Sequence, residues 1–438
     1  MLALAVPLVL AELGWMAMSI VDTLMVGRLP NSAVAIGAVS LGSILFHTGT
    51  IFGGAILLSL DTVVSQAYGA RRLDECHRTL WSALHLCAVL VPLLMLVNVA
   101  VASSLGPFGV NPDIRPSASS YIRILNWGTL PLMLYFAFRR YLQGMGIVRP
   151  VMFTLISANL INLFGNWVLI YGHLGFRAMG TDGSAWATGL ARIYMAGVLI
   201  ACALYYDRAR HSGMLRVSPA PDWKRLAGLL RLGLPAATHV VLEIGVFGLA
   251  TALIAKLDAA SLAAHQIALN AASVTFMVPL GISSAAAVRV GHLIGERKPL
   301  AAGRAGWSAL GCGVAFMTCA AIAFLAVPTE ITRFYTPDPT VIHLSVTLLA
   351  IAAAFQMFDG CQIVAAGALR GTGNTRTPML CNLFFYWFVG LPAGYALCFH
   401  AKWGAAGLWI GLCIGLILIG SVLLVVWRQT ALELSRHA

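Results

Sequence analysis

The sequence predicts an all-α integral membrane protein, with twelve transmembrane helices in two six-helix lobes that form a V-shaped carrier. Three observations predict this fold: an apolar composition, twelve stretches long enough to cross a bilayer, and a parallel internal repeat. The residues A, V, I, L, M, F, W, Y and C make up 59% of the 438 residues, and charged residues only 10%. A soluble domain carries ~25% charged residues and could not hide this much apolar surface from water. The composition therefore disfavours soluble enzymes, secreted modules and disordered chains.

The twelve apolar stretches define the predicted helices. A helix that crosses ~30 Å of hydrocarbon needs about 20 mostly apolar residues. The stretches that meet this requirement are, in order, 3–26, 33–64, 79–104, 118–143, 150–171, 183–205, 227–256, 262–291, 304–327, 341–369, 378–399 and 404–427.

The basic residues between these spans predict the orientation of the chain. The formal net charge is +12, and 20 Lys and Arg residues fall on one side of the predicted membrane against 6 on the other. Loops rich in Lys and Arg stay in the cytoplasm, so both termini are expected there, in a plasma membrane of the bacterial inner-membrane type. The basic clusters lie between apolar runs instead of forming a polar stripe, which disfavours nucleic-acid binding.

An internal repeat relates the two halves of the chain at offsets of 224 to 228 residues. Its matched blocks are Arg78–Leu84 with Arg304–Leu310, Gly144–Arg149 with Gly371–Arg376, Gly180–Gly183 with Gly404–Gly407, and Pro7 with Pro235. Each half carries six predicted helices, so both halves enter the membrane from the same side and form parallel repeats. We therefore expect lobes at 1–215 and 216–438, with the polar connection 207–225 between them. Two lobes with a cleft between them are typical of an alternating-access carrier.

Five acidic residues fall inside predicted spans: Glu12, Asp22, Asp61, Glu243 and Asp359. A charged side chain in mid-membrane costs at least ~2.5–3.5 kcal/mol on insertion scales. Such residues face a partner or a wet cavity, and they are candidates for function.

Glu243 and Asp359 are the candidates for cation coupling. Each lies near the middle of its span, and the repeat places apolar Trp15 and Leu132 at the corresponding positions. Burial and a second nearby carboxylate both make a carboxyl group hold its proton more readily. The pair could exchange H⁺ near neutral pH, or it could bind Na⁺. The alternative for Glu243 is a protonated side chain hydrogen-bonded within a helix interface.

Asp22 is the third candidate for cation coupling. Asn162 and Asn166 stand four residues apart on one helical face, and these two amides could form a polar cluster beside Asp22. The alternative is ordinary hydrogen bonding between helices. We expect Asp61 to pair with Arg71 or Arg72 at the cytoplasmic edge, whereas Glu12 receives no assignment.

Prolines and aromatic residues within the spans are weaker candidates. Pro7 and Pro235 match in the repeat, so we expect both lobes to bend alike at these positions. Aromatic side chains could line a cleft for flat cations, although core packing is their more common use. The candidate cleft aromatics are Tyr135, Phe136, Phe247 and Phe276.

The sequence lacks the motifs of several kinds of enzyme and metal site. The sequence contains no GxxxxGK[ST], HExxH or GxSxG pattern and no CxxC pair, so no nucleotide-driven pump, zinc site or cofactor is expected. His265 is interpreted as a hydrogen-bonded residue at a helix end and not as a metal ligand.

Four motifs are spread along the whole chain: Val21–Gly27, Ser65–Gly69, Ala263–Asn270 with Arg289–Glu296, and Asp359–Gly371. They resemble motifs of the MATE (multidrug and toxic compound extrusion) family, in its NorM-like branch. The resemblance implies twelve helices in two lobes and export of organic cations against inward flow of H⁺ or Na⁺.

The resemblance also implies roles for single residues. Glu243 and Asp359 match the acidic positions credited with cation coupling, and a bound Na⁺ would lie there. Asp22 matches the acid of the N-terminal lobe that is linked to proton coupling, and Asn162 and Asn166 match its polar partners.

The function expected is therefore a monomeric, cation-coupled exporter of drugs and organic cations in the lipid bilayer, and not an enzyme. A lipid-linked saccharide flippase of the same superfamily is the alternative, but it would require a cleft rich in Arg and Lys, and only Arg123 and Arg192 are assigned to the membrane interior and not to one of its two sides. An integral membrane enzyme is a more distant alternative, because no clustered catalytic set is visible. A channel is disfavoured because two bent parallel lobes favour rocking over a pore.

Overall fold

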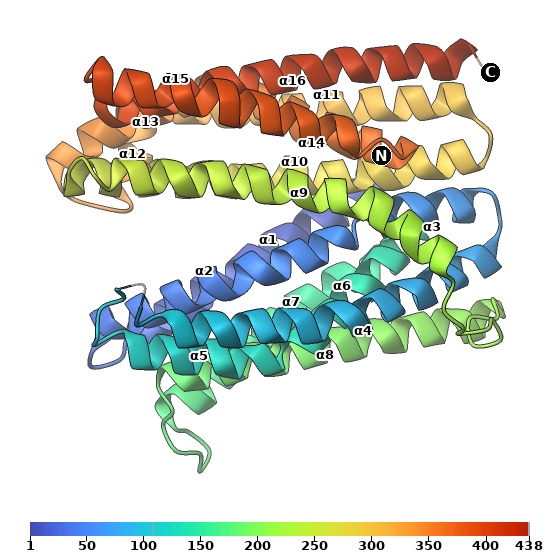
Figure 1. The fold of residues 1–438 in the computed structure, drawn as a ribbon, viewed down its shortest axis with the longest axis horizontal. Helices are drawn as coiled ribbons and strands as arrows, with labels where there is room; N and C mark the ends of the chain where they lie inside the picture. Colours follow the sequence, from blue (N-terminus) through green and yellow to red (C-terminus); the bar gives the residue numbers. More distant parts are fainter. Residues whose placement is uncertain (108, 437–438) are drawn as a thin grey trace. The chain divides into compact units, whose positions relative to one another are not determined.

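The computed structural model describes residues 1–107 and 109–436, and the regular structure in this part of the chain is helical (Figure 1). The first half contains α1 (Leu2–Val26), α2 (Ser32–Ile56), α3 (Ser59–Gly69), α4 (Leu73–Ser104), α5 (Arg115–Trp127), α6 (Thr129–Gly144), α7 (Arg149–Tyr171) and α8 (Thr181–Arg210). The second half contains α9 (Trp223–Ile254), α10 (Ala259–Gly295), α11 (Pro299–Ala326), α12 (Pro328–Arg333), α13 (Pro339–Thr372), α14 (Arg376–Asn382), α15 (Leu391–Tyr395) and α16 (Gly404–Arg436). Two π-helical segments, η1 (Leu383–Gly390) and η2 (Ala396–His400), flank α15. The predicted all-α membrane fold is confirmed.

Eleven helices of the described chain are long and apolar enough to cross a membrane. The predicted span 118–143 is not among them, because it is divided into α5 and α6 at Gly128. Pro131 explains the break. Its ring nitrogen carries no hydrogen and cannot donate to the carbonyl of Trp127, the last residue of α5. The predicted position of this span is therefore correct, but the sequence reasoning missed its interruption.

The chain divides into two compact units, which are described separately. One comprises Leu10–Ala237, and the other comprises Met1–Val9 together with the chain from Thr238 onward. The boundaries fall inside α1 and α9, two residues after Pro7 and Pro235. The boundary predicted between 215 and 216 lies in the connection between α8 and α9 and stays a prediction.

The predicted repeat is visible in the backbone. Gly180 and Gly404 both adopt positive φ, at 56° and 59°. Three residues later, a Cβ built on Gly183 would lie 2.5 Å from the carbonyl oxygen of Leu169. One built on Gly407 would lie 2.7 Å from the carbonyl carbon of Leu397. Glycine therefore permits the same close approach of two helices in each half.

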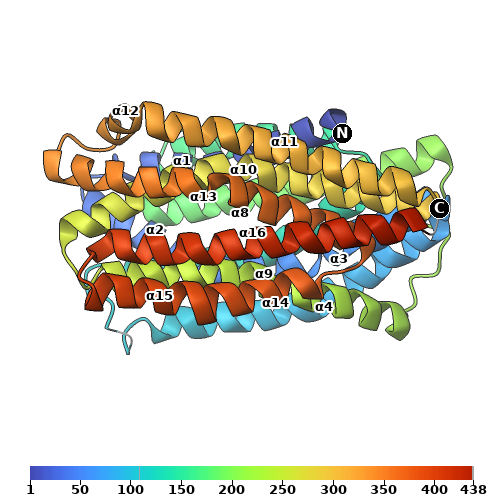
Figure 2. The same ribbon diagram turned by 90° about the horizontal axis from the view of Figure 1, so that it is seen from above.

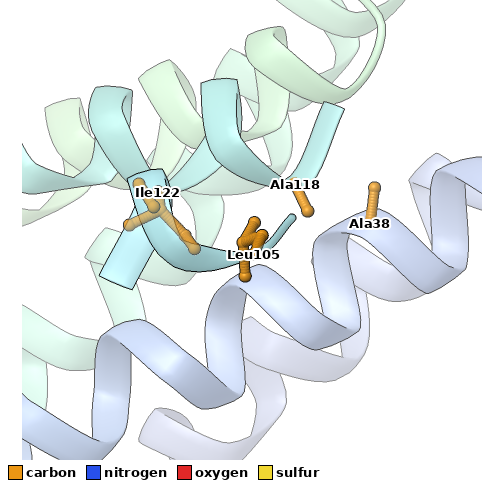
Figure 3. Close-up of a cluster of buried hydrophobic side chains, with 5 residues drawn as sticks. Ala38, Leu105, Ala118 and Ile122 are labelled. Atoms are coloured by element: carbon orange, nitrogen blue, oxygen red, sulfur yellow. The ribbon is translucent and has the colours of Figure 1, made fainter. Parts of the chain in front are cut away.

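Within the Leu10–Ala237 unit, α2, α4 and α5 pack around a small apolar core. Figure 3 shows Ala38, Leu105, Ala118 and Ile122 converging there, each at most 3% exposed. Within the second unit, α10, α11 and α16 pack against α13 (Figures 1 and 2). Large apolar side chains such as Leu96, Phe164 and Phe388 stay exposed, which suits a surface that faces lipid.

Candidate functional site

The first site is centred on Glu243, which lies midway along α9 and is half-buried. Its Oε1 accepts a hydrogen bond of 2.8 Å from Nε2 of Gln362 on α13. Asp359 stands three residues before Gln362, so both project from one face of α13. The charge of Glu243 acts on Asp359. The two acids predicted for cation coupling therefore lie close enough for the charge of one to act on the other.

Tyr386 completes this site, although the sequence reasoning missed it. It comes from η1, is fully buried, and its hydroxyl has no hydrogen-bond partner in the described structure. The charges of Glu243 and Asp359 both act on this hydroxyl. Phe247, one turn beyond Glu243, packs edge-on against the Tyr386 ring, with centroids 6.1 Å apart. One predicted cleft aromatic therefore lies at the acidic site.

The acidic pair has no basic partner. Neither Glu243 nor Asp359 takes part in an ion pair within the part of the chain that the structure describes. The Oε1 atom of Gln362 is also buried without a hydrogen-bond partner there. Carboxylate, amide and phenol oxygens are hard donors, a class that suits small hard cations. The chemistry of the donors therefore fits a proton or Na⁺ as cargo.

The second site is the polar cluster around Asp22 on α1. Asn166 Nδ2 donates to Asp22 Oδ1 at 2.6 Å and to Asn162 Oδ1 at 3.2 Å. Thr188 Oγ1 donates to Asp22 Oδ2 at 2.9 Å and accepts from Asn162 Nδ2 at 3.3 Å. All four side chains are buried. The predicted neighbours of Asp22 therefore do meet it.

Two members of this cluster come from α8 and were not predicted as site residues. Thr188 closes the network, and Arg192 follows one turn later on α8 and is fully buried. The charge of Arg192 acts on Asp22. The available signal was the arginine itself, because a basic residue within a span needs a partner as much as an acid does.

Two other membrane acids form ion pairs. Arg139 Nη2 on α6 donates to Glu12 Oε1 on α1, and both side chains are buried. Arg140 Nη1 pairs with Asp61 Oδ2 at 3.3 Å. The prediction that Asp61 pairs with Arg71 or Arg72 is therefore wrong, because Asp61 pairs with Arg140. Arg72 instead pairs with Glu75. Arg139 lies within α6 and is buried there, since Glu12 supplies its counter-charge.

The remaining aromatic candidates differ in exposure. Tyr135 is fully buried and stacks on Trp15, with centroids 6.1 Å apart and planes 7° apart. Phe136 also contacts Trp15 and is half-buried, as is Phe276 on α10. Tyr135 therefore serves as core in this structure.

The structure also shows where the two candidate bend residues and His265 lie. Pro7 and Pro235 lie inside α1 and α9, where the sequence placed them. His265 Nδ1 accepts from Trp409 Nε1 at 2.9 Å, and its Nε2 lies 2.8 Å from Thr251 Oγ1. His265 is therefore hydrogen-bonded, as interpreted, but α10 begins at Ala259, so this residue lies inside the helix and not at its end. No group of three metal-ligating side chains occurs among the described residues.

Comparison with known proteins decides the family. A sequence model of the MatE family matches residues 7–168 and, a second time, residues 235–396. The chain belongs to the MatE family. The two matches begin at Pro7 and Pro235, so both halves of the internal repeat carry the MatE pattern.

Curated relatives and solved MatE-type structures agree with this assignment. A "Probable multidrug resistance protein NorM" of Mesorhizobium japonicum is 37% identical over 435 residues, covering 98% of this chain and 93% of the relative. A protein of the same name from Xanthomonas axonopodis pv. citri is 36% identical, covering 99% and 94%. The structure also resembles "MATE in the straight conformation", with a TM-score of 0.89 and 16% identity, covering 99% and 96%. The predicted MATE membership with NorM-like relatives is confirmed.

Proposed function

We propose that this MatE protein is a secondary active efflux transporter that exports drugs and organic cations in exchange for H⁺ or Na⁺. It works by alternating access as a monomer in the bacterial inner membrane, with both termini in the cytoplasm, and it is not an enzyme. The names of the curated relatives support multidrug export. The observation that carries ion coupling is the pair Glu243 and Asp359, which has no basic counter-charge in the described chain.

The chemistry of that pair supports exchange. Two carboxylates that repel each other in a low-dielectric site are unstable while both are ionised. A proton or Na⁺ at Glu243 and Asp359 relieves this repulsion. The hydrogen bond from Gln362 to Glu243 favours the ionised state instead, so the cation can also be released. The site therefore loads and unloads a small cation without a fixed salt bridge.

An aromatic face at the acidic pair supplies binding for the exported compound, because Phe247 contacts Tyr386 beside Glu243. Phe136 and Phe276 are half-buried on α6 and α10, each within its own unit, and offer further ring faces. Flat organic cations are attracted by such ring faces. A drug cation and the coupling ion both carry positive charge, so they compete for the same acids. This competition is the basis of exchange.

The two proline positions supply the bending that alternating access needs. Pro7 and Pro235 interrupt the hydrogen-bond ladders of α1 and α9 at matching positions of the repeat. The boundaries between the two compact units follow each proline by two residues. We propose that α1 and α9 bend alike at these points during transport.

The test is efflux from proteoliposomes under separate H⁺ and Na⁺ gradients, with ethidium as the substrate. Glu243→Gln and Asp359→Asn should each abolish gradient-driven efflux while the protein still inserts and folds. Glu433→Gln, at an exposed acid near the end of α16, is the matched control and should export like the unaltered protein. Undiminished ethidium export by either site variant would refute the coupling role. Movement of ethidium without any gradient would favour a channel.

The flippase alternative is not favoured, because the curated relatives carry multidrug-resistance names. It would also require basic side chains at a cleft, and the two buried arginines of α6 and α8 are engaged elsewhere. Arg139 pairs with Glu12, and Arg192 interacts with Asp22.

A further inference from the structure

Arg192 is a buried cation without an ion pair. It is 1% exposed, and no carboxylate oxygen of the described chain lies within 4.0 Å of its nitrogens. Its Nη1 has no hydrogen-bond partner there. An uncompensated guanidinium is expensive to bury. The fold must therefore offer it some other compensation.

An aromatic ring and a glycine surround the side chain of Arg192. Its Cζ lies 4.6 Å from the centroid of the Phe46 ring on α2, a cation–π contact. A Cβ on Gly128 would lie 3.2 Å from Arg192 Nη1 and Cδ. The absence of a side chain at Gly128, between α5 and α6, therefore leaves room for this arginine. These contacts position the guanidinium, but they do not neutralise it.

Asp22 supplies the missing negative charge. Arg192 follows Thr188 by one turn of α8, and Thr188 donates directly to Asp22. The charges of Asp22 and Arg192 act on each other, and both act on the hydroxyl of Tyr121 on α5. The Asp22 site therefore contains one acid and one base, both buried, whose charges act on each other although they form no ion pair.

The other titratable groups around this pair are hydrogen-bonded to uncharged atoms. Tyr121 shares a hydrogen bond of 3.2 Å with Ser43. The Nδ1 atom of His47 on α2 lies 2.7 Å from the Ser43 carbonyl oxygen. The charge of Arg192 also acts on the His47 ring. The remaining neighbours of Asp22 are the amides of Asn162 and Asn166 on α7. Arg192 is thus the basic partner that faces Asp22 among the described residues.

We infer that Arg192 is an internal counter-cation that competes with the proton for Asp22. When Asp22 is ionised, the guanidinium balances its charge. When Asp22 binds a proton, Arg192 loses that balance, so the guanidinium promotes proton release. The site at Glu243 and Asp359 has no such residue and needs a cation from outside. The two halves of the repeat therefore handle charge differently, and Arg192 is a positioning residue that sets the proton affinity of Asp22.

This inference rests on the proposed function only for its biological role, since its central test needs no transport. Infrared spectra of the protein in lipid vesicles report the protonated carboxyl band as pH is varied, and Asp22→Asn identifies the Asp22 contribution. In Arg192→Met this band should persist to a pH higher by about one unit or more. Arg192→Lys, which keeps the charge, should stay close to the unaltered protein. An unmoved midpoint in Arg192→Met overturns the inference.

Two further measurements separate the possible failures. Arg192→Gln keeps a polar side chain without the charge and should shift the band like Arg192→Met. If neither neutral variant folds at any pH while Arg192→Lys does, the charge is needed for folding alone and the inference is wrong. In transport assays, the pH profile of Arg192→Met should move to higher pH. If the unaltered protein exports nothing under any gradient, the proposed function fails, whereas the infrared result stands independently.

Discussion

Gln362 Nε2 donates a hydrogen bond of 2.8 Å to Glu243 Oε1 and joins α13 to α9 at the acidic pair. A donor favours the ionised form of the carboxylate, and a hydrogen bond to a charged group is worth about 1.5–3 kcal/mol. Gln362→Leu should therefore shift the pH profile of efflux to higher pH by about one unit or more. The measurement is ethidium efflux from proteoliposomes at a series of pH values under a fixed gradient.

Gln356 provides the matched control for this prediction. It lies on the same helix and is equally buried, but its Nε2 donates to the neutral Thr275 Oγ1 at 2.8 Å. Gln356→Leu should lower thermal stability without moving the pH profile. Equal shifts in the two variants would mean that Gln362 acts only through packing.

The ion pair of Glu12 with Arg139 predicts a large effect on stability. Removing one partner leaves a buried charge uncompensated, which costs about 3–5 kcal/mol. Glu12→Ala should thus lower the unfolding temperature sharply in detergent micelles. Glu75→Ala is the control, because the Arg72–Glu75 pair is solvent-exposed and surface pairs contribute about 0–1 kcal/mol.

A double replacement tests whether the lone charge is responsible. Glu12→Leu combined with Arg139→Met removes both charges and should recover most of the stability that Glu12→Ala loses. If the double variant is as unstable as the single one, packing of the arginine stem accounts for the loss instead.

The helices were largely predictable, because the bilayer imposes one dominant requirement. Every span must hide its backbone polar groups within the helix and expose apolar side chains to lipid. Both features are local and visible in sequence. The break at Gly128 was not predicted. It follows from Pro131, whose missing N–H a hydropathy pattern does not register.

The candidate sites were predictable only in part. Asn162 and Asn166 share a helical face, so their common contact with Asp22 could be anticipated. Most contacts between helices could not be anticipated, since hydropathy carries no information on which helix faces pack together. Gln362 and Tyr386 were missed for this reason, and so was the partner of Glu12.

Gly183 predicts a steric effect that the repeat should duplicate. An alanine there would place its Cβ 2.5 Å from the carbonyl oxygen of Leu169, so α7 and α8 would have to separate. Overpacking of this kind costs about 1–3 kcal/mol or more. Gly183→Ala should lower the unfolding temperature, and Gly407→Ala should do the same against Leu397.

The same helix contains a control for Gly183. Nothing lies within 4 Å of a Cβ built on Gly189 of α8. Gly189→Ala should therefore be neutral or slightly stabilising, because alanine favours the helix. A loss of stability equal to that of Gly183→Ala would show that close approach is not the cause.

Asp258 begins α10, and its role predicts a pH-dependent effect on stability. Its Oδ1 accepts from the backbone N–H of Ser261 at 2.7 Å, and Oδ2 accepts from the Ser261 hydroxyl at 2.8 Å. These hydrogen bonds hold the pKa of Asp258 below its usual value. A lowered pKa in the folded state stabilises the protein above the unfolded pKa of about 3.9, and this contribution is lost as the pH falls through the folded value.

Asp258→Ala should therefore unfold at a lower temperature than the unaltered protein at pH 7, and the difference should shrink as the pH falls below about 4. Asp258→Asn keeps an oxygen that can accept from Ser261 but carries no charge. It should lose less stability than the alanine variant at pH 7, because only the charge-assisted part of the hydrogen bonds is removed. Thermal unfolding in detergent between pH 7 and pH 3 measures both variants. A gap between Asp258→Ala and the unaltered protein that stays constant over this range would show that the carboxylate charge does not stabilise the start of α10.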